Sequence, residues 1–161
     1  MMRKVLALIA FLTLPAFAEI PVPAAPTNYV TDAAGVLDDA RETALNEKLA
    51  QYEKETTNQF IVYIDRKLPE GVLLEDYTLA CANAWGIGQK EKNNGVVLFL
   101  FMDDRRSRIE VGLGLEEVLT HERAQQILLD LRPRMRTGDT TSAVEWAVQT
   151  IIDTIENTNA P

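Results

Sequence analysis

Residues 95–102 read GVVLFLFM and decide the fold, because an unbroken apolar run of this length is typical of a strand covered on both faces of a sheet. Residues 59–65, QFIVYID, form a second run of the same kind. A helix-patterned segment at residues 75–85 lies between them, so the two strands are expected to be parallel neighbours joined by a right-handed crossover. After a turn at residues 103–105, residues 106–113 alternate between apolar and polar side chains. This alternation predicts an antiparallel hairpin partner with one exposed face.

Four helices are expected around these strands. Apolar side chains recur at helical spacing in each helical segment, and Asp39 and Glu42 stand at capping-box spacing at the start of the first. The segments are residues 38–57, 75–85, 122–136 and 140–155. The order α, β, α, β, β, α, α predicts an α/β fold, a three-layer α/β/α sandwich around a small mixed β-sheet.

The first 18 residues, MMRKVLALIAFLTLPAFA, have the layout of a secretory signal peptide: a basic start, an apolar core and small residues before the cleavage site. Cleavage near Ala18 would leave a proline-rich leader at residues 19–28, interpreted as a spacer, a domain at residues 29–157 and a tail at residues 158–161. We therefore expect a periplasmic or secreted protein with no integral membrane segment in the mature chain. The single cysteine, Cys81, lies on the apolar stripe of its helix, which indicates a core residue.

Composition excludes several classes of function. The formal net charge of -8 argues against a nucleic-acid partner, because no basic stripe is present to neutralise phosphates. With His121 as the only histidine, neither a zinc site built on two imidazoles nor a Ser-His-Asp hydrolase is expected, and neither serine lies in a G-x-S-x-G turn. The sequence also lacks a G-x-x-x-x-G-K-[ST] phosphate loop.

Carboxylates remain as candidate functional groups. In the expected topology Asp32, Asp65, Asp103 and Asp104 all lie at the carboxyl edge of the sheet, where open α/β sheets usually bind ligands. Such a group suits a hard divalent cation, Ca²⁺ or Mg²⁺, which takes oxygen ligands. The alternative is that Asp32 only caps a turn and that Asp103-Asp104 is ordinary hairpin chemistry. Residue Asn94 and residues 112–117 are expected at the opposite edge.

Six short motifs across the mature chain resemble the TPM domain, the family named for thylakoid-lumen, photosystem II repair and levamisole-receptor-modulator members. The motifs are VTDAAGVL at 30–37, WGIG at 85–88, NNGV at 93–96, DDR at 103–105, EVGLGLE at 110–116 and GD at 138–139. The resemblance implies the α/β/α sandwich, an exported or lumenal location and divalent-cation binding. It also implies a helper role in assembly or turnover of membrane complexes, while a plant member is credited with acid phosphatase activity.

Carried over by the resemblance, Asp32, Asp103 and Asp104 are the acidic positions of the family's loops and candidate metal ligands. The other family-motif positions are Asn94, Arg105, Gly112, Gly114 and Glu116. The chain departs from the family in two ways. Many bacterial relatives continue into a transmembrane helix and a Gly-rich tail, whereas this sequence ends at Pro161, and residues 120–122 read THE where relatives often carry a Pro-Asp pair.

Three hypotheses follow. The favoured one is an exported, non-enzymatic accessory protein that binds a divalent cation and assists a membrane or envelope protein complex. The first alternative is a metal-dependent acid phosphatase, in which the same carboxylates hold an ion that activates water. The second is a protein-binding module that needs no ion.

Overall fold

The computed structural model describes residues 20–159, so the expected signal peptide at residues 1–18 and the last two residues of the tail lie outside the described part. The described chain contains four strands, four α-helices and one short 3₁₀-helix. The strands are β1 (Val30–Asp32), β2 (Gln59–Asp65), β3 (Gly95–Phe101) and β4 (Arg106–Val111). The helices are α1 (Asp39–Thr56), α2 (Leu74–Trp85), η1 (Leu113–Leu115), α3 (His121–Met135) and α4 (Thr140–Asn159).

The four strands form one mixed sheet in the order β1-β2-β3-β4. The β2 and β3 strands are parallel, with Gln59 opposite Gly95 and Asp65 opposite Phe101, and β4 is antiparallel to β3. Both pairings confirm the expectation. The sequence interpretation was incomplete at the other edge, because residues 30–32 form a strand parallel to β2 where only a short polar segment was expected. Three residues are too few to show a strand period, so only their pairing with β2 identifies them.

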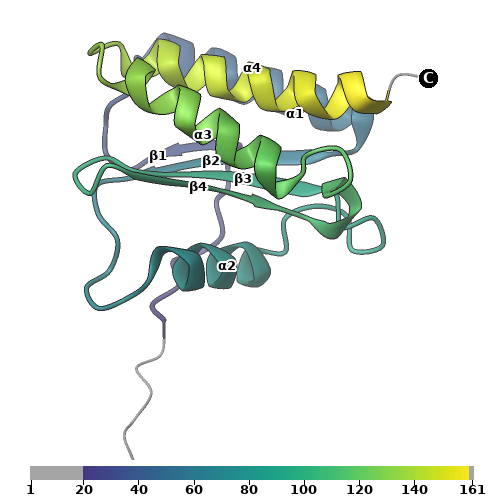
Figure 1. Cartoon of the computed structure of the whole chain (residues 1–161), viewed down its shortest axis with the longest axis horizontal. Helices are drawn as coiled ribbons and strands as arrows, with labels where there is room; N and C mark the ends of the chain where they lie inside the picture. Colours follow the sequence, from purple (N-terminus) through teal and green to yellow (C-terminus); the bar gives the residue numbers. More distant parts are fainter. Residues whose placement is uncertain (1–19, 160–161) are drawn as a thin grey trace, which may run out of the picture.

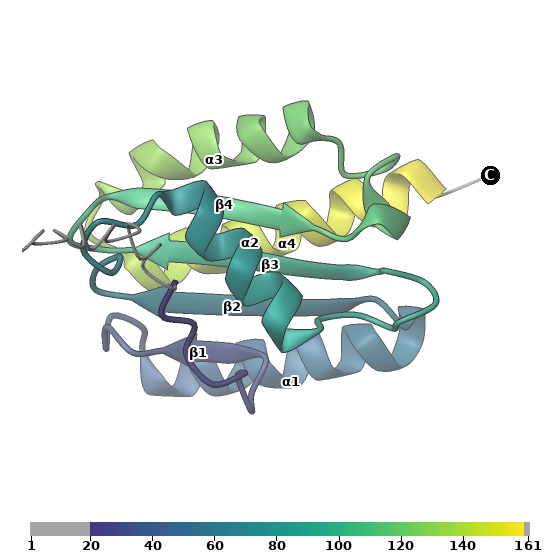
Figure 2. The ribbon, with the colours of Figure 1, turned by 90° about the horizontal axis from the view of Figure 1, so that it is seen from below.

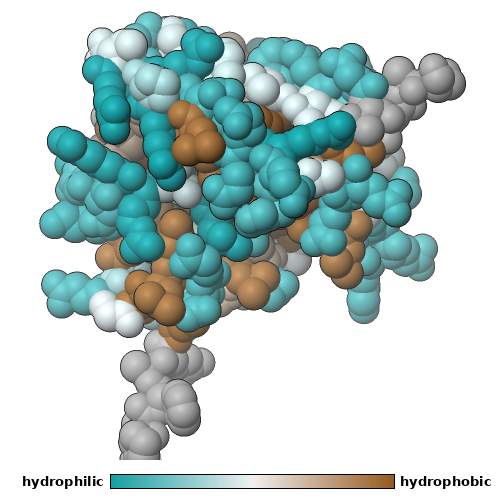
Figure 3. Space-filling view, viewed as in Figure 1, coloured by the Kyte–Doolittle hydropathy of each residue, from teal (hydrophilic) through white to brown (hydrophobic). Residues whose placement is uncertain are grey.

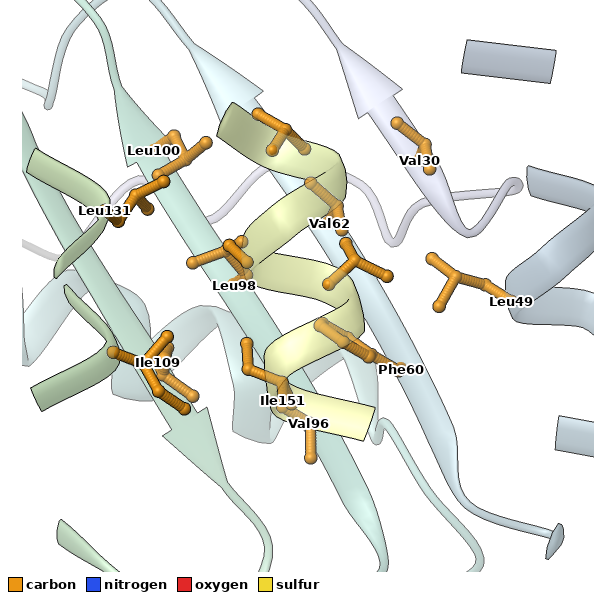
Figure 4. Close-up of a cluster of buried hydrophobic side chains, with 14 of the residues drawn as sticks. Val30, Leu49, Phe60, Val62, Val96, Leu98, Leu100, Ile109, Leu131 and Ile151 are labelled. Atoms are coloured by element: carbon orange, nitrogen blue, oxygen red, sulfur yellow. The ribbon is translucent and has the colours of Figure 1, made fainter. Parts of the chain in front are cut away.

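The sheet is covered on both faces, which confirms the three-layer sandwich (Figure 1). Three helices, α1, α3 and α4, lie on one face, and α2 lies alone on the other. Figure 4 shows the core between the sheet and the three helices, where Phe60, Val62 and Leu98 of the strands meet Leu49 of α1 and Ile151 of α4. All five side chains are fully buried. Burying each one stabilises the fold by about 1.5–3 kcal/mol. Most of the buried hydrophobic residues belong to this core, so this face supplies most of the driving force for folding.

A smaller, aromatic core lies between the sheet and α2. The rings of Tyr63, Trp85 and Phe99 pack together at centroid separations of 5.1–5.9 Å, with Trp85 stacked on Phe99 and Tyr63 tilted against both. Cys81 lies in the same cluster, is fully buried and has no disulfide partner, as expected for a core residue. Burial raises the pKa of its thiol to about 11.

The leader is part of this second core and does more than separate two segments. Ile20 and Val22 pack against the aromatic cluster, and the Trp85 Nε1–H donates a hydrogen bond of 2.9 Å to the Pro23 carbonyl. Figure 2, which looks onto the α2 side, shows this segment running across the sheet beside α2. The spacer interpretation was therefore wrong for the described part of the leader.

The polar face of β4 was expected to be exposed, and the structure corrects this. Glu110 is only 14% exposed because α2 covers it, and its carboxylate accepts hydrogen bonds from the Thr78 hydroxyl at 2.6 Å and from Arg108 Nε at 2.5 Å. Arg108 also approaches Glu75 of α2 at 3.9 Å. The alternation of apolar and polar residues in β4 shows that its second face is polar. It does not show whether that face contacts solvent or a helix that carries charged side chains.

The residue that caps α1 precedes the expected one, Asp39, by one position. Its N-cap is Asp38, whose carboxylate accepts the Arg41 N–H at 3.1 Å. The side chain of Arg41 then pairs with Glu145 and Ser142 at the start of α4, which joins the two helices.

No helix among residues 20–159 is both long and apolar enough to span a bilayer. Figure 3 shows a largely hydrophilic surface over α1, α3 and α4, with hydrophobic side chains gathered at the level of the sheet and α2. Leu73 and Leu79 on the α2 side are more than half exposed.

Candidate functional site

The strand register places the predicted acidic residues at one edge of the sheet. Asp32 ends β1 opposite Ile64, Asp65 ends β2 opposite Phe101, and Asp103 and Asp104 follow β3 directly. This carboxyl edge lies at the left of Figure 2. The topological placement is as expected, and the side-chain contacts decide what each carboxylate can still bind.

Asp32 closes the turn between β1 and α1. Its Oδ1 accepts the Gly35 N–H at 2.8 Å, and its Oδ2 accepts the N–H groups of Val36 and Leu37 at 2.7 Å each. Two carboxylate oxygens offer about four lone-pair directions, and three are taken here. Asp32 therefore has a structural task, and one lone pair of Oδ1 remains for another ligand.

Asp103 and Asp104 occupy the β3–β4 hairpin and are both exposed. The Asp104 Oδ2 accepts the Leu68 N–H at 2.7 Å, while the backbone N–H of Asp103 donates to the Arg66 carbonyl at 2.9 Å. These contacts join the hairpin to the loop after β2. Within residues 20–159 no three acidic, histidine or cysteine side chains are arranged as a metal site. A cation at this edge would thus draw on the Asp103-Asp104 pair, while Asp32, two strands away, stays with its own turn.

Asp65, between these two positions, is engaged by its neighbours. Its Oδ1 accepts the Arg66 N–H at 2.7 Å, and its Oδ2 lies 3.4 Å from the Tyr63 hydroxyl, which donates to it. Burial, and then the Asp65 charge, raise the pKa of Tyr63 to about 12. This tyrosine therefore stays a hydrogen-bond donor at neutral pH.

Asn94, Gly112, Gly114 and Glu116 lie at the opposite edge of the sheet. Most of them hold the loop before β3 against neighbouring backbone segments. Asn94 is buried and uses its whole amide: its Oδ1 accepts the Gln89 N–H at 2.8 Å, and its Nδ2 donates to the Thr57 carbonyl at 2.7 Å and to Asn58 Oδ1 at 3.1 Å. The side chain holds the loop before β3 against the loop after α1. Its role here is therefore to position backbone.

Gly112 and Gly114 allow the chain after β4 to touch that same loop. A Cβ at Gly112 would lie 2.1 Å from the Asn93 carbonyl oxygen, and one at Gly114 would lie 2.0 Å from the Lys92 carbonyl oxygen. Only glycine permits this approach. Glu116, just beyond η1, is exposed. A polar cavity of about 500 Å³ opens at this edge, lined in part by Asn58, Asn94 and Gly114.

Arg105 differs from the other motif positions because its backbone is left-handed, with φ 53°. It lies in the hairpin and lines a second cavity together with Arg132 of α3 and Arg136, the C-cap of that helix. The sequence interpretation did not connect these two helical arginines with a site. Their i, i+4 spacing at the end of a helix was the available signal, and it is also the usual pattern of residues that complement a helix dipole.

The model of the family described as the TPM domain, which carries the name TPM phosphatase, matches residues 30–154. None of the curated proteins compared matches the sequence.

Three solved structures are similar. The N-terminal domain of a protein from P. gingivalis is 32% identical, with a TM-score of 0.74 over 82% of this chain and 84% of that chain. The N-terminal domain of a Corynebacterium glutamicum protein is 16% identical, with a TM-score of 0.60 over 87% and 88% of the two chains. The BA42 protein of Bizionia argentinensis is 13% identical, with a TM-score of 0.64 over 75% and 82%. The last two show likeness of fold alone.

Proposed function

The chain belongs to the TPM domain family, and on that basis we propose that it is an exported, non-enzymatic accessory domain that binds a divalent cation, Ca²⁺ or Mg²⁺, and assists the assembly or turnover of a membrane or envelope protein complex. One observation carries the cation part of the proposal. The register of the three parallel strands gathers Asp32, Asp103 and Asp104 at the carboxyl edge, the edge at which open α/β sheets bind ligands.

The ligand supply at this edge favours a hard and weakly held cation. Asp103 and Asp104 are exposed neighbours, so their carboxylates can turn toward one ion. Hairpin carbonyls and water would complete the oxygen shell. Because Asp104 also accepts the Leu68 N–H, binding would tighten the contact between the hairpin and the loop after β2.

The placement of the only histidine supports a non-enzymatic role. His121 is the first residue of α3, which follows η1 and so begins near the amino edge of β3, away from the acidic edge. A general acid–base partner for the carboxylates would have to lie within hydrogen-bond reach of the reacting group. The proposed site therefore lacks an imidazole that could act as a general acid or base.

A calorimetric Ca²⁺ titration tests the proposal. The wild-type protein should give a saturable heat, and the double variant Asp103→Asn/Asp104→Asn should lose most of it. A matched control, Glu116→Gln/Glu117→Gln, removes two charges at the opposite edge and should titrate like the wild type. Equal heats from the wild type and the Asp103/Asp104 variant would disprove the site.

A metal-dependent acid phosphatase is the second candidate, favoured by the name that the family model carries and by Arg105 beside the acidic pair. In such an enzyme the carboxylates would hold the ion, and a nearby guanidinium would bind the phosphoryl oxygens. Phosphate release from p-nitrophenyl phosphate that survives purification and is lost in Asp104→Asn would support this candidate. Unchanged release by the variant would identify a contaminant.

The partner complex is best approached by cross-linking in the intact cell envelope. The proposed accessory role predicts a membrane or envelope complex that co-purifies with the protein and is lost when a chelator is added. Co-purification that persists after the chelator is added would favour the ion-independent protein-binding module.

The same cells test the proposed location, because the exported protein should start near Glu19 and be released with the periplasmic or secreted fraction.

A further inference from the structure

A cavity of about 410 Å³ lies at the carboxyl edge, between the β3–β4 hairpin and the last turn of α3. Four of its lining residues are arginines, and they come from both elements. Arg105 and Arg106 belong to the hairpin, Arg132 to the helix, and Arg136 is the C-cap of the helix. These four are a quarter of the 16 Lys and Arg residues of a chain whose net charge is -8. Such a concentration of positive charge in an acidic protein calls for a local cause.

The four guanidinium groups are exposed, and within residues 20–159 none of them forms an ion pair. Complementing the dipole at the carboxyl end of α3 accounts for Arg132 and Arg136. It does not account for Arg105 and Arg106, which belong to another element. Arginines from two elements that line one cavity can together bind an oxyanion through forked hydrogen bonds.

The floor of the cavity is apolar. Leu131 is buried, and Met102 and Met135 are half-buried there. Methionine side chains adapt to irregular apolar shapes, and the volume is at the lower end of the range for small-molecule sites. We propose that this arginine-rimmed cavity binds a small amphiphilic oxyanion, a phosphate or carboxylate head on a compact apolar body, independently of any cation at the acidic edge.

The backbone of Arg105 adds support. A non-glycine residue with φ 53° is in a strained region that glycine would fill without cost. The hairpin nevertheless carries an arginine there, and this residue lines the cavity. An anion-binding role for the guanidinium gives this strained choice a reason.

Titration followed by amide chemical shifts tests the proposal, with the purified protein in EDTA so that cation binding plays no part. Phenylphosphonate and benzoate supply the two possible heads on one apolar body, inorganic phosphate supplies a head alone, and benzyl alcohol supplies the body alone. At least one of the two amphiphiles should bind saturably, with shifts confined to residues 100–107 and 131–136, and the tighter one identifies the head. Phosphate should bind more weakly, and benzyl alcohol should not bind.

Variants separate binding from folding. Arg105→Gly removes a guanidinium while relieving the backbone, so it should fold at least as stably as the wild type and bind about tenfold more weakly. Arg134→Gln is the matched control, because Arg134 lies 4.1 Å over the Trp146 ring and does not line the cavity. It should bind within about twofold of the wild type. Absence of saturable binding, binding of phosphate as tight as that of the tighter amphiphile, or equal weakening by Arg134→Gln would each overturn the proposal.

Discussion

Replacing Asp32 by alanine should cost about 3 kcal/mol of unfolding free energy, because the carboxylate holds three backbone N–H groups. The N–H of Gly35 belongs to an exposed residue, so water can replace its acceptor. Val36 is half-buried and Leu37 is buried, so their N–H groups lose an acceptor that water replaces poorly. A hydrogen bond to a charged group contributes about 1.5–3 kcal/mol, and two such bonds, taken at the low end for a half-buried carboxylate, give the figure of about 3 kcal/mol.

Urea denaturation followed by circular dichroism measures this loss, once in EDTA and once in CaCl₂. Asp38→Ala is the matched control, since it removes one carboxylate that caps one exposed N–H at the start of α1, and it should cost about 1 kcal/mol. The loss at Asp32 should be present in EDTA, because the turn needs no ion. A loss below about 1 kcal/mol in EDTA, or one that appears only with Ca²⁺, would refute the assignment of Asp32 to the turn.

Three further outcomes are expected. Gly114→Ala should destabilise the protein by about 2 kcal/mol or more in the same urea assay, because the new Cβ would lie 2.0 Å from the Lys92 carbonyl oxygen; an unchanged midpoint would contradict the close approach. The pKa of the Cys81 thiol is raised above its ordinary value of 9 to about 11, so the stability that depends on the protonated thiol is intact below pH 9 and is lost as the pH rises toward 11. Between pH 8 and pH 10.5 the unfolding free energy should therefore fall less for Cys81→Ala than for the wild type. Equal falls in the two proteins would count against the burial of the thiol. Trp85→Phe removes the bond to the Pro23 carbonyl, so limited proteolysis should cut the leader faster while the rest of the domain stays resistant.

The central strands and the four helices were predictable because their patterns are long. Residues 95–101 are all buried, so their apolar character is continuous in the sequence and in the sheet. The β1 strand was not predictable on the same grounds, since three residues carry no period and its pairing partner is about thirty positions away. Only its pairing with β2 in the folded protein identifies it.

The candidate site divides in the same way. The edge at which Asp32, Asp103 and Asp104 lie follows from strand order and direction, which the apolar runs indicate. The hydrogen bonds that already engage Asp32 and Asp104 depend on loop backbone geometry, which no spacing rule reports. The arginine-rimmed cavity was missed because it joins a hairpin to a helix end about thirty residues later in the chain.

The two outer strands bear on how the protein behaves when it is crowded. An open strand edge can recruit another chain and start aggregation, and natural sheets limit this with short or charged edges. One edge of this sheet, β1, is three residues long. The other, β4, carries Arg106, Arg108 and Glu110, so a chain that added to it would have to accommodate their charges. The charged network beneath α2 thus also disfavours edge-to-edge polymerisation.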